Sequence, residues 1–242
     1  MAKTIKESDE TKIKILTAAK KEFANKGFNG ARMSSIAAIA GVNQALLHYH
    51  FENKENLYRS IFQTAIGDIA TEFSERLASE VDQWNVRLDI QLCAAIYTMI
   101  AISMDSHDDD LHRIFAREMA EGQGLLHEYV KRYMMPRLIL FENIIKEGVE
   151  TGIFETSNTM LFSMNVVAFI LNFSHWEDFF TDTPLHKSLY GNKKETLYNY
   201  MIEMAFKSLR PKGKELKIPV LDKEKKDRIN HIVNEIYGTL MF

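Results

Sequence analysis

Apolar positions recur at helical spacing through the first sixty residues and are interrupted by glycine and asparagine. The segment from about Ser8 to Lys26 predicts a first helix, and Gly27 after it is a typical C-terminal stop. The apolar face of this helix carries Ile13, Leu16, Ala19, Phe23 and Ala24.

Two short helices with a tight connection are predicted next. The segment MSSIAAIA at residues 33–40 ends at Gly41, where a turn needs a residue without a side chain. The segment QALLHYHF at residues 44–51 follows Asn43, a favourable N-cap. Together with the first helix, these segments predict a three-helix helix-turn-helix unit. Its small core is expected to contain Ile36, Ala37, Ala40, Val42, Leu47 and Phe51.

The third predicted helix has one apolar face and one unusual polar face. Leu47 and Phe51, four residues apart, are expected to point inward. The outward stripe has few of the Lys and Glu side chains of an ordinary solvated surface, and it suits contact with base edges and phosphates in a DNA major groove. Its members are Gln44, Ala45, His48 and Tyr49.

The rest of the chain is predicted as further helices. A fourth begins near Lys54 and continues past Leu77, and Pro136 is expected to kink a helix that extends from about Leu125 to Glu150. Other helices are predicted at residues 86–104, 108–121, 157–180 and 193–210, with a loop containing Pro184 and Gly191 between the last two.

The C-terminal segment is less expected. A linker at residues 211–221 precedes an amphipathic helix at 222–240, which is expected to pack on its own body or to reach across a dimer. The apolar face of this helix contains Ile229, Ile232, Val233, Ile236, Tyr237 and Leu240.

Composition supports an all-α protein. The 242 residues are 46% hydrophobic, enough for a packed core, and include only 4 prolines. Residues 1–60 contain ten Lys or Arg against six Asp or Glu, whereas the remainder contains 20 against 27. This asymmetry indicates a basic N-terminal module for a polyanion and an acidic body with another task.

The single cysteine and the absence of long apolar runs predict a soluble cytoplasmic protein. Cys93 lies in an apolar run and is expected to be a buried, inert thiol rather than a redox sensor. The N-terminal MAKTIKESDETK has no apolar signal core, and the runs at 92–104 and 160–173 are shorter than the roughly 20 residues of a membrane helix. No membrane partner is expected.

Other chemistry is not supported by the motifs. The chain has no serine elbow, Walker loop, HExxH or glycine-rich dinucleotide turn, so no enzyme activity and no cofactor are predicted. Glu118 and Arg117 are expected to pack, as an internal polar pair, rather than contact an effector. An acidic and histidine cluster is expected to be a solvated helix start rather than a metal site. That cluster contains His107, Asp108, Asp109, Asp110 and His112.

The stretch GFNGARMSSIAAIAGVNQALLHYHFENKENLY, residues 27–58, resembles the DNA-binding domain of regulators of the tetracycline-repressor (TetR) type. The resemblance includes a glycine-aromatic pair, an "IA..AGV" helix and turn, "L.YHF" and "NKE.L", each at the family spacing. With the first helix included, it extends over residues 14–58.

The resemblance implies which residues meet DNA. Lys54 opens the fourth helix where the family uses a lysine on phosphate, and Ala31 stands where a threonine often caps the second helix. Arg32 and Ser34 are therefore expected to anchor phosphate there, and His48 replaces a common tyrosine. The whole expected DNA-binding set is Arg32, Ser34, Asn43, Gln44, Ala45, Leu46, His48, Tyr49, His50 and Lys54.

The resemblance also implies an organisation and a function. Residues 1–55 are expected to form the DNA-binding domain, 56–210 an effector-binding and dimerisation domain, and 211–242 a linker with an extra helix. The expected function is a homodimeric repressor that binds palindromic double-stranded operator DNA and is released by an apolar small molecule. Alternatives are control by a protein partner or by no ligand, and an all-α enzyme or adaptor whose helix-turn-helix is only structural.

Two sets of body residues follow from this hypothesis. A largely apolar effector cavity is expected between residues 84–104, 112–125 and 160–180, with Met99, Phe115 and Trp176 as its candidate lining. In this family the last two body helices of two subunits pack as a four-helix bundle. The expected dimer interface contains Phe162, Val166, Phe169, Ile170, Phe173, Tyr198, Met201 and Ile202.

Overall fold

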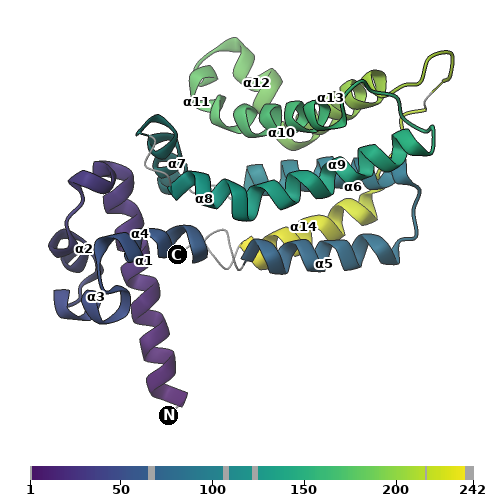
Figure 1. The fold of residues 1–242 in the computed structure, drawn as a ribbon. Helices are drawn as coiled ribbons and strands as arrows, with labels where there is room; N and C mark the ends of the chain where they lie inside the picture. The colour runs from purple at the N-terminus through teal and green to yellow at the C-terminus, as the bar shows by residue number, and fades with distance from the viewer. Residues whose placement is uncertain (1, 65–68, 106–108, 122–124, 216, 238–242) are drawn as a thin grey trace. The chain divides into compact units, whose positions relative to one another are not determined.

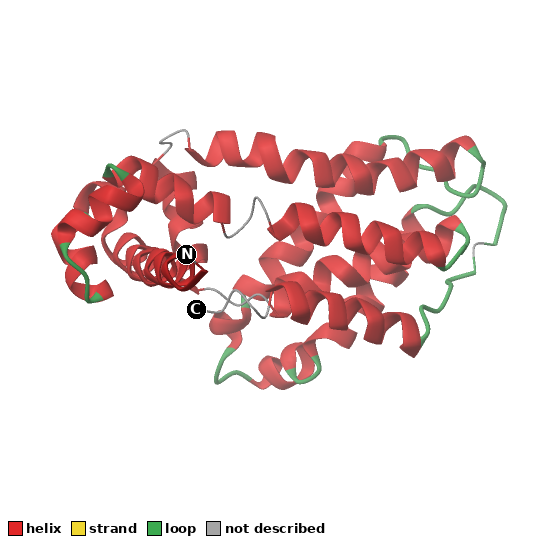
Figure 2. Cartoon of the chain, turned by 90° about the horizontal axis from the view of Figure 1, so that it is seen from below, coloured by secondary structure: helices red, strands yellow, loops and turns green. Residues whose placement is uncertain are grey.

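A computed structural model describes the chain except for residues 1, 65–68, 106–108, 122–124, 216 and 238–242. Every regular element within the described residues is a helix, so the all-α prediction is confirmed (Figures 1 and 2). The chain divides into two compact units. Among the described residues, unit 1 comprises those within 2–71 and 109–133, and unit 2 comprises those within 72–105 and 134–237.

Unit 1 contains the predicted helix-turn-helix. Helix α1 extends over Ala2–Gly30, and Gly27 interrupts its helical geometry with a φ of 68°. Helix α2 covers Met33–Ala40 and helix α3 covers Gln44–Phe51, both with the predicted bounds. Helix α4 covers Lys54–Phe62. The core of these helices includes Ile15, Phe23, Ile36, Ala37, Leu47, Phe51 and Leu57, whereas the predicted core residues Ala40 and Val42 are only half-buried.

The turn between α2 and α3 depends on glycine. Gly41 ends α2 with a φ of 67°, and its N–H donates to the carbonyls of Ala37 and Ala38. L-residues with a Cβ rarely adopt this left-handed conformation, which explains the glycine. Asn43 then caps α3 as predicted, because its side-chain oxygen accepts a hydrogen bond of 2.9 Å from Ala45 N–H.

Unit 1 also contains helices that the predicted division at residue 55 assigned to the body. Helix α7, Asp109–Glu121, packs along α1, and helix α8, Leu125–Tyr129, follows it. The Phe115 ring lies 5.4 Å from the Phe62 ring and 5.3 Å from the Tyr129 ring. The Tyr58 hydroxyl donates a 2.8 Å hydrogen bond to buried Glu118, so Glu118 pairs with Tyr58 rather than with Arg117. Arg117 instead donates to the backbone carbonyl of Asn25.

Unit 2 is built around helix α6, Leu88–Asp105, which contacts α9, α10, α13 and α14 (Figure 1). Leu92, Ile96 and Ile100 on α6 are fully buried. The remaining helices are α5 (Ile69–Gln83), α9 (Met135–Glu150), α10 (Thr159–His175), α11 (Glu177–Phe180), α12 (Pro184–Tyr190), α13 (Lys193–Ser208) and α14 (Lys223–Tyr237).

Several predicted elements differ from the observed ones. The predicted fourth helix is described as α4 and α5, and residues 65–68 between them lie outside the described residues. The expected break near Pro136 is confirmed, since a π-helical segment at Val130–Met134 precedes α9. The loop predicted around Pro184 is wrong: this proline lies in the first turn of α12, where its missing N–H costs nothing.

The C-terminal helix is confirmed in position and in face. Ile229, Ile232, Val233 and Ile236 of α14 are buried, and α14 packs against α6 within unit 2. Leu240 and the side chain of Tyr237 lie outside the described residues. Cys93 is buried as expected, and burial raises the pKa of its thiol to about 12, which keeps it protonated. No single helix in the described part of the chain combines the length and hydropathy of a membrane span.

Candidate nucleic-acid interface

The outward face of α3 is open to solvent, as predicted. Leu47 and Phe51 are buried in unit 1, whereas Gln44, Ala45 and His48 are exposed. Tyr49 is 79% exposed, a large fraction for an aromatic side chain on a short helix. An amide, a small residue, an imidazole and a phenol are therefore available together on one helix face, the chemistry that base edges and phosphates require.

Intramolecular contacts orient part of this face. The Nδ1 atom of His48 lies 2.8 Å from the carbonyl oxygen of Glu52, which can only accept a hydrogen bond. A neutral His48 is thereby held as the Nδ1–H tautomer, which leaves Nε2 as an acceptor. The ring of half-buried His50 packs 5.2 Å from the Tyr49 ring, and Leu46 is also half-buried.

Lys54 is held inside unit 1 more firmly than its predicted role suggested. It begins α4 after the N-cap Asn53, whose side chain accepts from Asn56 N–H at 2.8 Å. The Lys54 ammonium donates a 3.2 Å hydrogen bond to the carbonyl of Ala31 and lies 4.7 Å from the centre of the Phe28 ring. These contacts fix the ammonium beside the start of α4, where helix N–H groups also favour an anion.

The start of α2 shows a residue that the sequence analysis missed. Arg32 and Ser34 are exposed, but the N-cap Arg32 forms no side-chain cap. Glu22 on α1 instead contacts the start of α2: it is 3% exposed, and its carboxylate accepts from the Ser35 side chain, the Arg32 backbone and Lys26. Burial alone raises the pKa of Glu22, but the hydrogen bonds from Lys26 and Ser35 outweigh it and hold that pKa below its ordinary value. Glu22 and the start of α2 lie too far apart in the sequence for a local motif to indicate this contact.

The three predicted effector residues are distributed over both units. Phe115 belongs to the aromatic cluster of unit 1, whereas Met99 and Trp176 lie in unit 2. Met99 is half-buried, and Trp176 is 46% exposed. The effector cavity at these residues remains a prediction.

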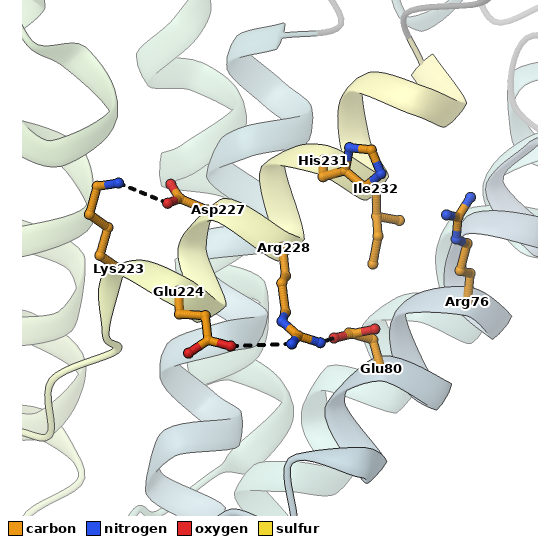
Figure 3. Close-up of a pocket in the computed structure, with 8 residues that line it drawn as sticks. All are labelled: Arg76, Glu80, Lys223, Glu224, Asp227, Arg228, His231 and Ile232. Atoms are coloured by element: carbon orange, nitrogen blue, oxygen red, sulfur yellow. Dashed lines mark hydrogen bonds and ion pairs between the residues drawn. The ribbon is translucent and has the colours of Figure 1, made fainter.

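A different hollow, of about 630 Å³, lies open between α5 and α14 in unit 2 (Figure 3). It is lined mostly by charged side chains, such as Glu80 and Arg228, and these are engaged in ion pairs with one another. It therefore differs in chemistry from the predicted apolar cavity.

The predicted dimer residues need revision. Val166, Ile170, Phe173, Tyr198, Met201 and Ile202 are buried within a single subunit, since their helices α10 and α13 pack against α6. Phe162 is half-buried and Phe169 is 36% exposed. A side chain buried in its own subunit offers no surface to a partner, so the apolar surface of α10 lies on other residues. Leu161, Met164, Ala168 and Leu171 are exposed.

No metal site accompanies these features in the part of the chain that the structure describes, where no three His, Cys, Asp or Glu side chains form a suitable cluster. Asp109 and Asp110 lie in the first turn of α7, where acidic residues complement the helix dipole. His107 and Asp108 of the predicted cluster lie outside the described residues.

Two family models match the chain. Residues 15–61 match the model "Bacterial regulatory proteins, tetR family", which covers α2, α3 and most of α1 and α4. Residues 88–210 match the model "HTH-type transcriptional dual regulator CecR, C-terminal domain". The second match spans half of the chain and contains α6 to α13.

Curated relatives agree with these models. The chain is 28% identical over 149 residues to the probable HTH-type transcriptional regulator YttP of Bacillus subtilis, a match that covers 57% of this chain and 64% of that protein. It is 23% identical over 140 residues to the fatty acid metabolism regulator protein of the same organism, covering 58% and 69%. The match thus spans less than two thirds of the first relative's length.

Solved structures share the fold. A mutant of HlyIIR in which one segment is replaced by a linker is 22% identical, with a TM-score of 0.58 over 79% of this chain and 97% of that one. FadR from Bacillus subtilis, in complex with stearoyl-CoA, is 19% identical, with a TM-score of 0.56 over 78% and 96%. With the N-terminal and C-terminal models matched in order, the chain is a member of the TetR family of bacterial transcriptional regulators.

Proposed function

We propose that this chain is a homodimeric repressor that binds palindromic operator DNA through α2 and α3 and is released by a small-molecule effector. The observation that carries the proposal is the open face of α3. Gln44, His48 and Tyr49 are exposed opposite a fully buried Leu47, so that the face is presented by a rigid helix. Such presentation suits base reading, because a backbone that is already folded as a helix loses little further entropy on binding.

Homodimerisation is supported by a stripe on α10. Leu161, Met164, Ala168 and Leu171 are exposed and follow one another by three, four and three residues. This is the spacing with which a helix packs along a partner helix. Leu161 is 63% exposed and Met164 50%, so the stripe offers apolar surface that a second subunit would cover.

Release by an effector is supported by relatives. One solved neighbour contains stearoyl-CoA and another, a putative regulator from Saccharomonospora viridis, contains choline. The named relatives include repressors, such as BepR of Brucella suis, and an activator, FasR. The proposed mechanism is a population shift: an effector weakens DNA binding only by its differential affinity for the DNA-competent and DNA-incompetent states.

The experiment is a titration of the chain against the DNA upstream of its own gene, read by fluorescence anisotropy. We expect saturable binding with one dimer per site and a steep salt dependence. Binding no tighter than to scrambled DNA of the same length would overturn the proposal and favour a structural helix-turn-helix. A compound screen on the DNA complex then tests ligand control, and release only by a protein fraction would favour the partner-controlled alternative.

A further inference from the structure

Lys226 of α14 is enclosed by groups that recognise an ammonium ion. Its side chain is 16% exposed, and its nitrogen lies 4.3 Å from the centre of the Tyr198 ring and 5.2 Å from that of Tyr97. Both carboxylate oxygens of Glu195 accept hydrogen bonds from this nitrogen, at 3.0 and 2.9 Å. Two aromatic rings and one carboxylate are the set that binds an organic cation by cation–π attraction and charge-assisted hydrogen bonds.

The recognising groups and their occupant come from different parts of the chain. Tyr97 on α6 and Glu195 and Tyr198 on α13 lie within residues 88–210, the segment matched by the CecR C-terminal-domain model. Lys226 lies on α14, beyond the end of both matches, after a segment in which no described residue is helical. The three groups that surround the ammonium therefore lie outside α14, and α14 brings the ammonium itself.

The site also contains a buried polar atom that forms no hydrogen bond with Lys226. The hydroxyl of Tyr198, a residue that is 5% exposed, is buried without a hydrogen-bond partner among the described residues. The Cys93 thiol lies near the Tyr198 hydroxyl, but a thiol is a weak hydrogen-bonding group. Because a buried unpaired polar atom is costly, this hydroxyl favours a ligand that carries a polar group of its own.

We propose that Tyr97, Glu195 and Tyr198 form a binding site for the primary ammonium group of an alkylamine ligand, which Lys226 fills in cis while α14 is docked. A primary ammonium is favoured over a quaternary one because both oxygens of Glu195 receive N–H donors. The inference names the ligand class for the effector-binding role proposed above, and so rests on that role. Ligand entry displaces Lys226 and thereby loosens α14.

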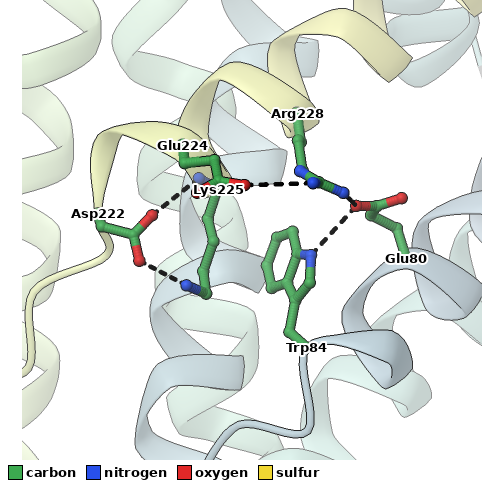
Figure 4. Close-up of polar contacts among 6 residues, drawn as sticks. All are labelled: Glu80, Trp84, Asp222, Glu224, Lys225 and Arg228. Carbon is green, nitrogen blue, oxygen red and sulfur yellow. Dashed lines mark hydrogen bonds and ion pairs between the residues drawn. The ribbon is translucent and has the colours of Figure 1, made fainter.

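The attachment of α14 is compatible with such displacement. Two ion pairs join α14 to α5: Arg228 with Glu80 (Figure 4) and Glu235 with Arg76. Their side chains are partly exposed, and such pairs contribute little to stability. The buried apolar face of α14 resists release, and a tethered lysine competes at an effective concentration on the order of millimolar. We therefore expect weak amine binding to the intact chain and tighter binding once the lysine is removed.

The first experiment measures binding of n-butylammonium, whose length reproduces the lysine side chain, by calorimetry without DNA. Lys226→Ala should bind this probe at least about tenfold tighter than Lys223→Ala. Lys223→Ala is the matched control, since it removes the same charge from a side chain of α14 that is 90% exposed. If Lys226→Ala fails to fold, Lys226→Met keeps the apolar stem and repeats the comparison. Equal affinity for the test and control variants would overturn the site.

Further substitutions, each combined with Lys226→Ala, test the chemistry of the site. In the Lys226→Ala background, Glu195→Gln should weaken probe binding at least about tenfold, because the carboxylate is lost. Tyr198→Phe should leave it nearly unchanged, because the ring face remains. Tetramethylammonium should bind more weakly than n-butylammonium. Probe binding that is insensitive to Glu195→Gln would show a different site and overturn the assignment.

The intact chain tests whether Lys226 occupies the ammonium site of its own chain. The indole N–H of Trp84 donates to Glu80 at 3.1 Å, and the Lys225 ammonium lies 5.7 Å from a Trp84 ring, so this tryptophan reports α14 docking (Figure 4). With Trp176→Phe as the background, n-butylammonium should change Trp84 fluorescence saturably, and Glu195→Gln should abolish the change. Binding to Lys226→Ala without any Trp84 response in the intact chain would overturn displacement. Because no DNA is present, failure here is distinct from failure of operator binding.

Discussion

Gln44 and Lys54 belong to one expected DNA surface but have different surroundings. Gln44 is exposed on the first turn of α3, whereas half-buried Lys54 is already bonded to the Ala31 carbonyl and lies over the Phe28 ring. The first side chain is free to meet a base edge, and the second is fixed where the start of α4 attracts phosphate. Their substitutions should therefore have different consequences.

Gln44→Ala should relax base preference at one position of each half-site, since one amide–base pair contributes about 1–3 kcal/mol of discrimination. Lys54→Ala should weaken binding to every sequence and lower the log–log salt slope by roughly one per lost phosphate contact per subunit. Titrations on cognate and scrambled DNA at several salt concentrations measure both effects. Lys54→Arg is the control that keeps the charge. Parent-like binding by both alanine variants would show that α3 and the start of α4 do not read DNA.

Glu22→Gln should destabilise unit 1 by about 1 kcal/mol, because the carboxylate serves the uncapped start of α2. The pKa of Glu22 in the folded protein lies below its ordinary value of 4.5, so its contribution is fully present above pH 4.5 and disappears as the pH falls through the folded pKa. Urea unfolding of both proteins at pH 7 and at lower pH measures the difference. A difference that stays constant or grows on acidification would contradict this role; Glu10→Gln, an exposed position on α1, is the control.

Helices were predictable where their signals are local. The bounds of α2 and α3 followed from Gly41, Asn43 and the periodicity between them. Helix α12 was missed because Pro184 was interpreted as a loop residue, although proline also favours a first helical turn. Apolarity alone could not show that Val166 packs inward while Met164 on the same helix is exposed, because α10 is apolar on several faces. Glu22 was missed since its partners lie on another helix.

Gly41→Ala should destabilise the helix-turn-helix by about 1 kcal/mol, because a Cβ strains the left-handed conformation at φ 67°. A Cβ at this position meets no atom within 4 Å, so backbone strain and not a clash is the cause. Thermal unfolding measures the change. Gly41→Asn should retain more stability than Gly41→Ala, because asparagine tolerates this conformation. If both variants lose the same stability, backbone strain at this turn is not the reason for the glycine.

The proposed function assigns its two tasks to the two compact units of the chain. The expected DNA surface lies entirely in unit 1, and the exposed apolar stripe of α10 lies entirely in unit 2. A palindromic operator requires two copies of unit 1 at a fixed spacing, and only an interface between subunits can set that spacing. Dimerisation and DNA affinity are therefore expected to fail together when the stripe is altered, even though the reading residues are untouched.

Leu161→Glu combined with Met164→Glu should convert the dimer to a monomer, because each charge would face an apolar partner helix without a compensating cation. Light scattering at micromolar concentration measures the mass, and operator titrations should show loss of affinity with a salt slope reduced to about half. The control is Phe179→Glu on α11, an apolar side chain that is 80% exposed and outside the stripe. If the double variant remains a dimer, or if the parent chain is itself a monomer, the α10 stripe is not the interface. A monomer that still binds the operator like the parent would separate the two tasks and remove the reason for a palindromic site.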